Sequence, residues 1–127
     1  AKARPLEALP NLTTDTQPLL DDDRVQIVVE VIGGVDKAYH LVVDALKRGK
    51  HVVTANKALI ATHGPELFAL AAQHNARLMF EGAVAGGIPI IAPLKRSLAA
   101  NRIEAMAGIL NGTTNYILTR MTETGAS

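Results

Sequence analysis

The spacing of apolar and polar residues predicts a strand followed by a helix near the start of the chain. Residues 25–32 form a β-branched run that ends at two glycines, and we expect this run to be a strand buried on both faces apart from Glu30. Over residues 36–50 the apolar positions recur at the intervals of a helix. Asp36 is suited to cap the start of this helix and Gly49 its end.

The next part of the chain repeats this order of elements. A short apolar run at residues 51–55 predicts a second strand, and Asn56 is suited to cap a short helical turn that reaches Ile60. We expect a separate helix to begin at Pro65, because proline is favoured in the first turn of a helix. Residues 77–83 then predict a third strand.

The last part of the chain predicts two more helices and one more strand. Pro89 is expected to open a helix that ends at Asn101, and residues 102–110 predict a fourth strand. Residues 112–114 are typical of a turn and helix cap, and we expect the final helix over residues 113–123. Because strands alternate with helices throughout, the pattern favours an α/β sheet with right-handed crossovers.

Composition changes this picture by indicating what fills the core and which partners are excluded. Hydrophobic residues make up 48% of the 127 residues and aromatic residues only 3%, so the core is aliphatic, as suits a parallel sheet covered by helices. The formal net charge of +1 argues against nucleic acid or a membrane surface as an obligate partner. The lack of cysteine excludes disulfides and zinc–thiolate sites, and it fits a reducing cytoplasm.

Several other classes of function find no support in the sequence. No apolar run reaches the ~18 residues that would span a bilayer. No two of the histidines are spaced as zinc ligands on a helix, and neither Ser97 nor Ser127 stands in the setting of a hydrolase nucleophile. No signal peptide is visible, and because the chain begins at Ala1 rather than at methionine, we expect part of the natural N-terminus to be missing.

Two candidate sites follow predicted strands. Gly33 and Gly34 stand between a strand and a helix without the G-x-G-x-x-G pattern, so they form either a tight turn or a loop pressed against a cofactor. Lys57 is either an ordinary surface residue or a functional one. It follows the second strand at the sheet edge where α/β proteins bind ligands, and there it can hold an anionic substrate or polarise a carbonyl.

A third candidate site is the glycine-rich segment after the third predicted strand. Glu81 ends that strand, and Gly86 with Gly87 frees the backbone to approach a ligand closely. One interpretation is a partly buried carboxylate that accepts backbone hydrogen bonds. The other is a site for a hard cation, built from the carboxylate and backbone carbonyls.

Four blocks in this order (VVEVIGG, HVVTANKALIA, EGAVAGGIPII and GILNGTTNYIL) resemble the homoserine dehydrogenases. The resemblance implies reduction of aspartate 4-semialdehyde to homoserine with NADPH or NADH, on the route to threonine and methionine. It implies the second half of a Rossmann-like parallel sheet running into the start of an α+β catalytic domain. Residues 1–86 would end the NAD(P)-binding domain, and residues 87–127 would begin the catalytic and dimerisation domain of a homo-oligomeric cytoplasmic enzyme.

The same resemblance implies roles for individual residues. Lys57 would contact both cofactor and substrate and act in catalysis. The loop near the nicotinamide would consist of Ile32, Gly33 and Gly34. A site for a monovalent cation, sodium or potassium, would be formed by Glu81, Val84, Gly86 and Ile88.

The chain departs from the family pattern in what it lacks. The glycine fingerprint for the pyrophosphate and the lysine that donates the proton both lie outside it, so we expect the chain alone to be inactive. One alternative is a non-catalytic α/β scaffold or assembly module, although such a protein would not need Lys57, Glu81 and the glycines at these spacings. A second alternative is a related amino-acid-pathway oxidoreductase, against which the block at residues 112–115 argues.

Overall fold

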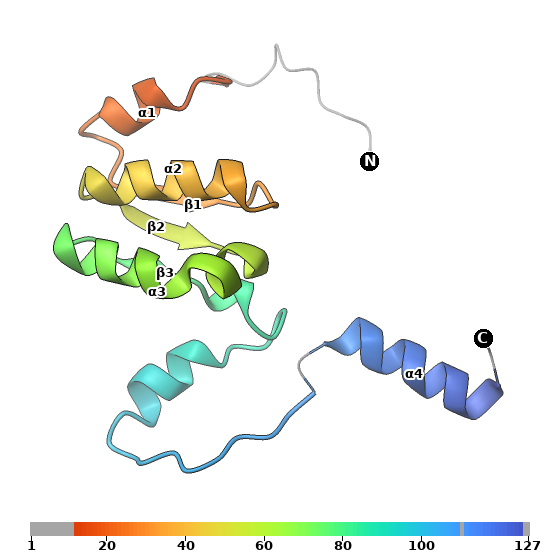
Figure 1. Ribbon diagram of the computed structural model, residues 1–127. Helices are drawn as coiled ribbons and strands as arrows, with labels where there is room; N and C mark the ends of the chain where they lie inside the picture. The colour runs from red at the N-terminus through yellow and green to blue at the C-terminus, as the bar shows by residue number, and fades with distance from the viewer. Residues whose placement is uncertain (1–11, 110, 126–127) are drawn as a thin grey trace.

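The computed structural model describes residues 12–109 and 111–125 (Figure 1). Its centre is a parallel sheet with the strand order β1-β2-β3. The strands are β1 (Ile27–Glu30), β2 (His51–Thr54) and β3 (Leu78–Met79). The helices are α1 (Gln17–Asp21), α2 (Asp36–Lys47), α3 (Lys57–Gln73) and α4 (Gly112–Thr124). The α/β class and its parallel sheet are therefore confirmed.

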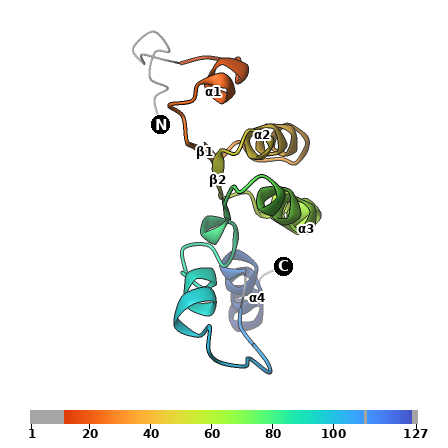
Figure 2. The same cartoon turned by 90° about the vertical axis from the view of Figure 1, so that its left-hand side faces the viewer.

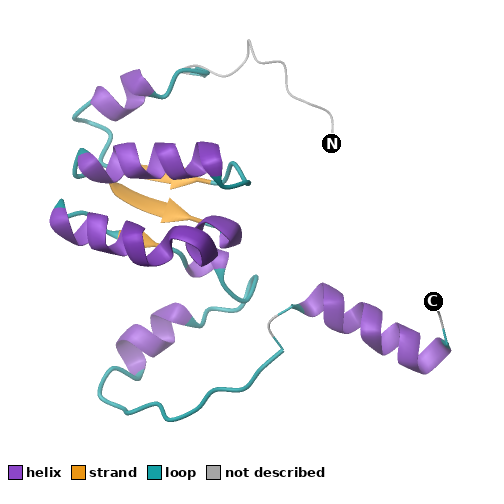
Figure 3. Ribbon diagram, in the orientation of Figure 1, coloured by secondary structure: helices purple, strands orange, loops and turns teal. Residues whose placement is uncertain are grey.

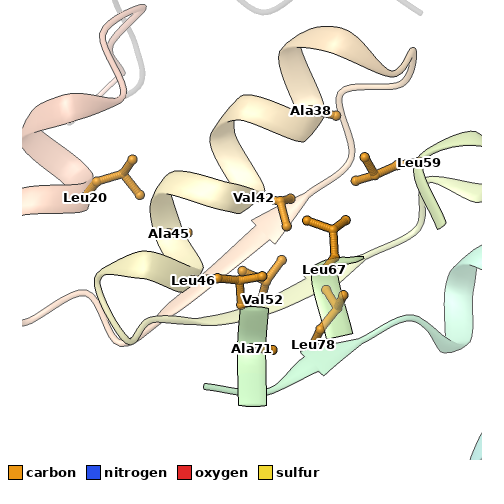
Figure 4. Packing of buried hydrophobic residues seen from close by; sticks show 10 residues of the cluster. All are labelled: Leu20, Ala38, Val42, Ala45, Leu46, Val52, Leu59, Leu67, Ala71 and Leu78. Carbon is orange, nitrogen blue, oxygen red and sulfur yellow. The ribbon is translucent and has the colours of Figure 1, made fainter. Parts of the chain in front are cut away.

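The crossover helices α2 and α3 both pack on the same face of the sheet (Figure 2). Between helices and sheet lies a cluster of aliphatic side chains, of which Leu46, Leu59 and Leu67 are fully buried (Figure 4). Burial of each leucine stabilises the fold by about 1.5–3 kcal/mol. Leu20 of α1 joins this cluster at its edge. The core is thus one-sided, and it fixes the sheet to the two helices.

The prediction that β1 is buried on both faces apart from Glu30 is wrong. Ile27 and Val29 are 57% and 63% exposed, whereas Glu30 is fully buried. Side chains alternate between the two faces of a strand, and the helices cover only one of these faces. Glu30 points to the covered face, and the exposed aliphatic residues point to the bare one.

The two helices predicted after β2 are one continuous helix, α3, with Pro65 inside it. Asn56 caps this helix as predicted, because its side chain accepts a hydrogen bond from the backbone N–H of Leu59 at 3.1 Å. Leu59 and Leu67 stand eight residues apart on the buried side of α3. Packing of this continuous face outweighs the single backbone hydrogen bond that proline removes.

Beyond β3 the predictions hold less well. The third strand covers only two residues, and a 3₁₀ turn follows it, η2 (Glu81–Ala83). The helix predicted from Pro89 is a short helical stretch that contains a π-helical turn, η3 (Pro93–Ser97). Helix α4 is confirmed, with Asn111 as its N-cap. In the part of the chain that the structure describes, no helix is long and apolar enough to cross a membrane.

The predicted strand at 102–110 is not formed over its described residues, 102–109. A strand needs a neighbour to pair with, and no described segment pairs with this one. Its apolar side chains are exposed, Ile103 by 44% and Met106 by 72%. The sequence pattern predicted a strand from local features, but strand formation also needs a pairing partner, and none is present among the described residues.

Candidate functional site at the carboxyl edge of the sheet

Three loops leave the carboxyl ends of the three parallel strands and meet at one edge of the sheet (Figure 3). They are residues 31–35 after β1, residues 55–56 after β2 and the segment from residue 80 after β3. Ligands of open α/β sheets bind at this edge. Lys57, Glu81 and the glycine pair after β1 all stand on or beside these loops.

The loop after β1 contains the two adjacent glycines in left-handed conformation. Gly33 has φ +79° and Gly34 has φ +72°, which a residue with a Cβ adopts only with strain. No atom lies within 4 Å of a Cβ built on either glycine, so the loop borders open space. Ile32 is 57% exposed beside them. This loop is a tight turn whose outer side is free for a ligand.

A buried hydrogen-bond network fixes the start of this loop. The Glu30 carboxylate accepts a hydrogen bond from the backbone N–H of Ile32 at 2.8 Å. It also accepts one from the Thr54 hydroxyl at 2.5 Å. Glu30 and Thr54 are directly paired in the register of β1 and β2, and both are buried. Sequence reasoning missed both residues.

Asn56 links this network to the start of α3. Its backbone N–H donates to the Thr54 hydroxyl at 2.9 Å, and its side-chain Nδ2 donates to the carbonyl of Gly34 at 2.6 Å. Its Oδ1 is the acceptor that caps α3. A single buried side chain therefore joins the loop after β1 to the helix that begins at Lys57.

Lys57 is the first residue of α3 and lies at the carboxyl end of β2, as predicted. Its side chain is exposed. It makes no ion pair or hydrogen bond with the residues that the structure describes. The ammonium is therefore available to a ligand at this edge, and its backbone is held by the capped first turn.

The turn after β3 packs closely on the loop after β2. A Cβ added to Gly82 would lie 3.3 Å from the Cβ of Ala55, so only glycine lets the two segments approach this closely. At Gly86 and Gly87, where the sequence suggested a close approach to a ligand, no protein atom lies within 4 Å of a Cβ, so the space beside them is open. Within the described residues, the tight contact of this segment is at Gly82.

The Glu81 carboxylate caps the helical stretch that follows the glycine segment. It accepts hydrogen bonds from the backbone N–H groups of Ile90, Ile91 and Ala92 at 2.6, 2.8 and 2.8 Å. Partial burial disfavours its charged form, but the N–H groups of Ile91, Ala92 and Ile90 together outweigh burial and hold the pKa of this carboxyl below its usual value. Glu81 thus has the backbone-bonded role that was one of its two interpretations.

Between Glu81 and this helical stretch lies a loop in which several backbone carbonyls accept no hydrogen bond. Ala85 and Gly86 are consecutive left-handed residues, with φ of 55° and 62°. The carbonyls of Val84, Gly86 and Ile88 accept no hydrogen bond from any residue that the structure describes. Among those residues, no group of three or more His, Asp or Glu side chains is arranged to hold a metal ion.

A hollow lies at the opposite edge of the sheet. It has a volume of about 340 Å³, and its lining includes Arg48, Lys50 and His51 near the start of β2. The Lys50 ammonium is already bonded to the backbone carbonyls of Asp22 and Val25, at 2.8 and 2.7 Å. This hollow contains none of the predicted site residues.

Comparison with known families identifies both halves of the chain. Residues 2–81 match the family model described as the NAD-binding domain of homoserine dehydrogenase, and residues 89–127 match the one described as homoserine dehydrogenase. The homoserine dehydrogenase of Synechocystis is 55% identical over 91% of this chain, and that of Corynebacterium glutamicum is 54% identical over 91%. The chain spans 27% and 26% of these two relatives.

Solved structures agree with these matches. The crystal structure of a homoserine dehydrogenase from Thiobacillus denitrificans has a TM-score of 0.87 and 53% identity, covering 94% of this chain and 28% of that one. A hyperthermophilic archaeal homoserine dehydrogenase in complex with NADPH has a TM-score of 0.77 and 35% identity, covering 89% and 35%. Family models, relatives and structures agree, and the chain belongs to the homoserine dehydrogenase family.

Proposed function

We propose that the intact protein is an NAD(P)-dependent oxidoreductase that interconverts L-homoserine and L-aspartate 4-semialdehyde. In that reaction the NAD(P) cofactor would accept the hydride from C4 of homoserine and the hydroxyl proton would pass to water, so the alcohol would become an aldehyde. Besides family membership, one observation carries the proposal. The turn at Gly33 and Gly34, with its open outer side, is tied directly to the start of the helix that presents Lys57.

In this proposal residues 1–86 end the NAD(P)-binding domain and residues 87–127 begin the catalytic domain. The packing supports the division, because the buried core draws its residues from α1 to β3 and none from α4. Helix α4 instead exposes Tyr116, Ile117 and Leu118 by 50% or more. Contact of these side chains with a second copy of the chain would be consistent with a homo-oligomer. The reaction belongs to threonine and methionine synthesis, for which we propose a cytoplasmic location.

The loop of Ile32, Gly33 and Gly34 is proposed to lie against the nicotinamide. Open space beside the two glycines would admit a flat ring that a side chain there would obstruct. Ile32 is exposed at the same loop and offers an apolar contact for that ring. The cofactor supplies the hydride chemistry, and these residues orient it.

Lys57 is proposed to act on the substrate oxygen. During aldehyde reduction negative charge develops on the carbonyl oxygen, and a fixed ammonium stabilises this charge. The ammonium has no partner among the described residues, and it stands on a capped helix turn that limits its movement. Its proposed role is to position and polarise the substrate and to contact the cofactor.

A monovalent cation, sodium or potassium, is proposed at the loop that follows Glu81. Oxygen ligands suit such hard ions, and the unused carbonyls of Val84, Gly86 and Ile88 are ligands of this kind. The Glu81 carboxylate is largely occupied by backbone N–H groups, but its Oε2 accepts only one of them and retains capacity for a further contact. The cation would neutralise charge and fix the loop between the two domains.

The test is an assay of the purified intact protein with homoserine and NADP or NAD, following formation of the reduced nicotinamide. We expect homoserine-dependent turnover, and we expect Lys57→Ala to lower it about ten-fold or more, because one such electrostatic contact contributes ~2–4 kcal/mol. Lys47→Ala, at the far end of α2, is the matched control and should retain activity. Absence of homoserine-dependent turnover, or full activity of Lys57→Ala, would contradict the proposal.

A further inference from the structure

Glu30 is a buried carboxylate that the proposed chemistry does not use. Its side chain is fully buried, and it forms no ion pair with any described residue. Burying a charge is unfavourable unless hydrogen bonds compensate for the lost water. Here the compensation comes from the Ile32 N–H and the Thr54 hydroxyl, each bonded to a different carboxylate oxygen. Both partners belong to the carboxyl edge of the sheet.

The hydrogen bonds around Glu30 close a ring that spans two loops. From Glu30 the ring passes to the Thr54 hydroxyl, then to the backbone N–H of Asn56, and then through the Asn56 side chain to the carbonyl of Gly34. Chain connectivity leads from there to Ile32, whose N–H returns to Glu30. The ring therefore includes the loop at residues 32–34, which the proposed function places against the nicotinamide. It also includes Asn56, which directly precedes Lys57.

The direction of each hydrogen bond in this ring is set by chemistry. The Thr54 hydroxyl donates its proton to the Glu30 carboxyl group. The oxygen of the same hydroxyl is then left to accept from the Asn56 N–H. A valine at position 54 would fill similar space but could not join the two loops. The polar ring thus specifies one arrangement of the loops, which apolar packing would leave free to shift.

We propose that Glu30, Thr54 and Asn56 are positioning residues that hold the loop at residues 32–34 and Lys57 at a fixed separation for hydride transfer. This inference rests on the proposed function. Hydride transfer needs donor and acceptor carbons in near contact, so a small displacement of either side slows the step strongly. The ring joins the element that would orient the nicotinamide to the one that would orient the substrate.

Asn56→Ser separates positioning from the capping of α3. Serine caps a helix about as well as asparagine. Its shorter side chain does not reach the Gly34 carbonyl, which Asn56 contacts through Nδ2. Thr54→Val removes the hydroxyl at nearly constant volume, and Thr54→Ser restores it. Asn111→Ser is the matched control, because it makes the same change at the N-cap of α4.

The experiment compares these variants in the intact protein, with homoserine and with homoserine deuterated at C4, at saturating NADP. We expect Asn56→Ser and Thr54→Val to lower kcat about ten-fold. The primary isotope effect on kcat should rise in both, because hydride transfer becomes slower than product release. Thr54→Ser and Asn111→Ser should keep kcat within two-fold of the wild type, with the isotope effect unchanged.

The outcomes separate the two claims. If the active wild type and both Asn56→Ser and Thr54→Val share one kcat and one isotope effect, the positioning role is overturned. The same holds if these two variants only lower the melting temperature. If Thr54→Val does not fold, Asn56→Ser carries the decision alone, because it retains the helix cap. A folded wild type without homoserine-dependent turnover overturns the proposed function, and the inference falls with it.

Discussion

The same helix cap occurs in two regions of the molecule with different consequences. Asn56 at the start of α3 and Asn111 at the start of α4 each accept a hydrogen bond from the backbone N–H three residues later, at 3.1 and 3.0 Å. Asn56 is only 7% exposed and also holds the Gly34 carbonyl. Asn111 is exposed, and its side chain makes no second hydrogen bond with the described residues. The two caps are locally alike, and it is the additional tertiary hydrogen bond of Asn56 that makes this residue part of the candidate site.

The regions that carry these caps differ in the same way. Helices α2 and α3 bury a continuous aliphatic face against the sheet, whereas no residue of α4 is buried. Figure 1 shows α4 apart from the sheet and its two helices. The α/β region therefore derives its stability from packing. Helix α4 relies on local hydrogen bonds and on whatever covers it in the intact protein.

The sharpest way to test this contrast is to remove one aliphatic side chain from each region. Leu46→Ala leaves a cavity in a fully buried site of α2 and should lower the free energy of unfolding by about 2–5 kcal/mol. Ile117→Ala in α4 removes a half-exposed side chain and should change it by no more than about 0.5 kcal/mol. Urea unfolding of the chain measures both values, and equal losses would contradict the contrast.

The two caps provide the next test. Asn56→Ala removes the cap and leaves the Gly34 carbonyl without its partner, so we expect a loss of about 2–3 kcal/mol in the free energy of unfolding. Asn111→Ala removes only the cap and should cost about 1 kcal/mol or less of helix stability. Urea unfolding measures the first loss, and helix content by circular dichroism measures the second. A greater sensitivity at Asn111 would break the comparison.

Alanine substitutions at two glycines near the site should differ in their effect on stability by a smaller amount. Gly82→Ala places a methyl group 3.3 Å from Ala55 and should destabilise the protein by about 1 kcal/mol through crowding. Gly87→Ala meets no atom within 4 Å and should change stability by no more than about 0.5 kcal/mol. Melting temperatures of the two variants decide this point. If Gly87→Ala is the more destabilising of the two, the packing at Gly82 is misjudged.

The smallest expected effect concerns an exposed ion pair before β1. The Asp22 carboxylate accepts side-chain and backbone hydrogen bonds from Arg24, which lower the pKa of Asp22 from 3.8 to about 2. Because the folded-state pKa is the lower one, the pair adds stability above pH 3.8, and this contribution disappears as the pH falls through about 2. An NMR titration should place the Asp22 carboxyl near 2, and in Arg24→Ala its pKa should rise only part of the way toward 3.8, because the backbone N–H of residue 24 still donates to it. An unshifted wild-type carboxyl would disprove the contact.

Elements with a strong local signal were predictable from the sequence. Helix α2 shows helical spacing of apolar residues, and β2 is a short apolar run before a cap. The segment at residues 102–109 also carried a local strand prediction, yet it has no partner strand among the described residues. The helix break predicted at Pro65 is absent, because packing of α3 outweighs the local tendency of proline to interrupt a helix. Partners distant in sequence decided both cases.

The candidate site shows the same division. The position of Lys57 at the carboxyl end of β2 was predictable, because it follows a strand and a capping residue, which are local features. Glu30 and Thr54 were not, because their contact depends on the register of β1 against β2, 24 residues apart in sequence. A carboxylate inside a β-branched run was the one available signal. It was interpreted as the exposed exception in the strand, whereas it is the buried one.

The central claim is that the carboxyl edge of the sheet faces the nicotinamide and substrate, and that the amino edge does not. Hydrogen–deuterium exchange of the intact protein, with and without NADPH, tests this claim most directly. We expect NADPH to slow exchange in the peptides covering residues 31–35 and 55–59, and to leave residues 47–51 at the amino edge unchanged. Protection at residues 47–51 with none at the carboxyl edge would contradict the account.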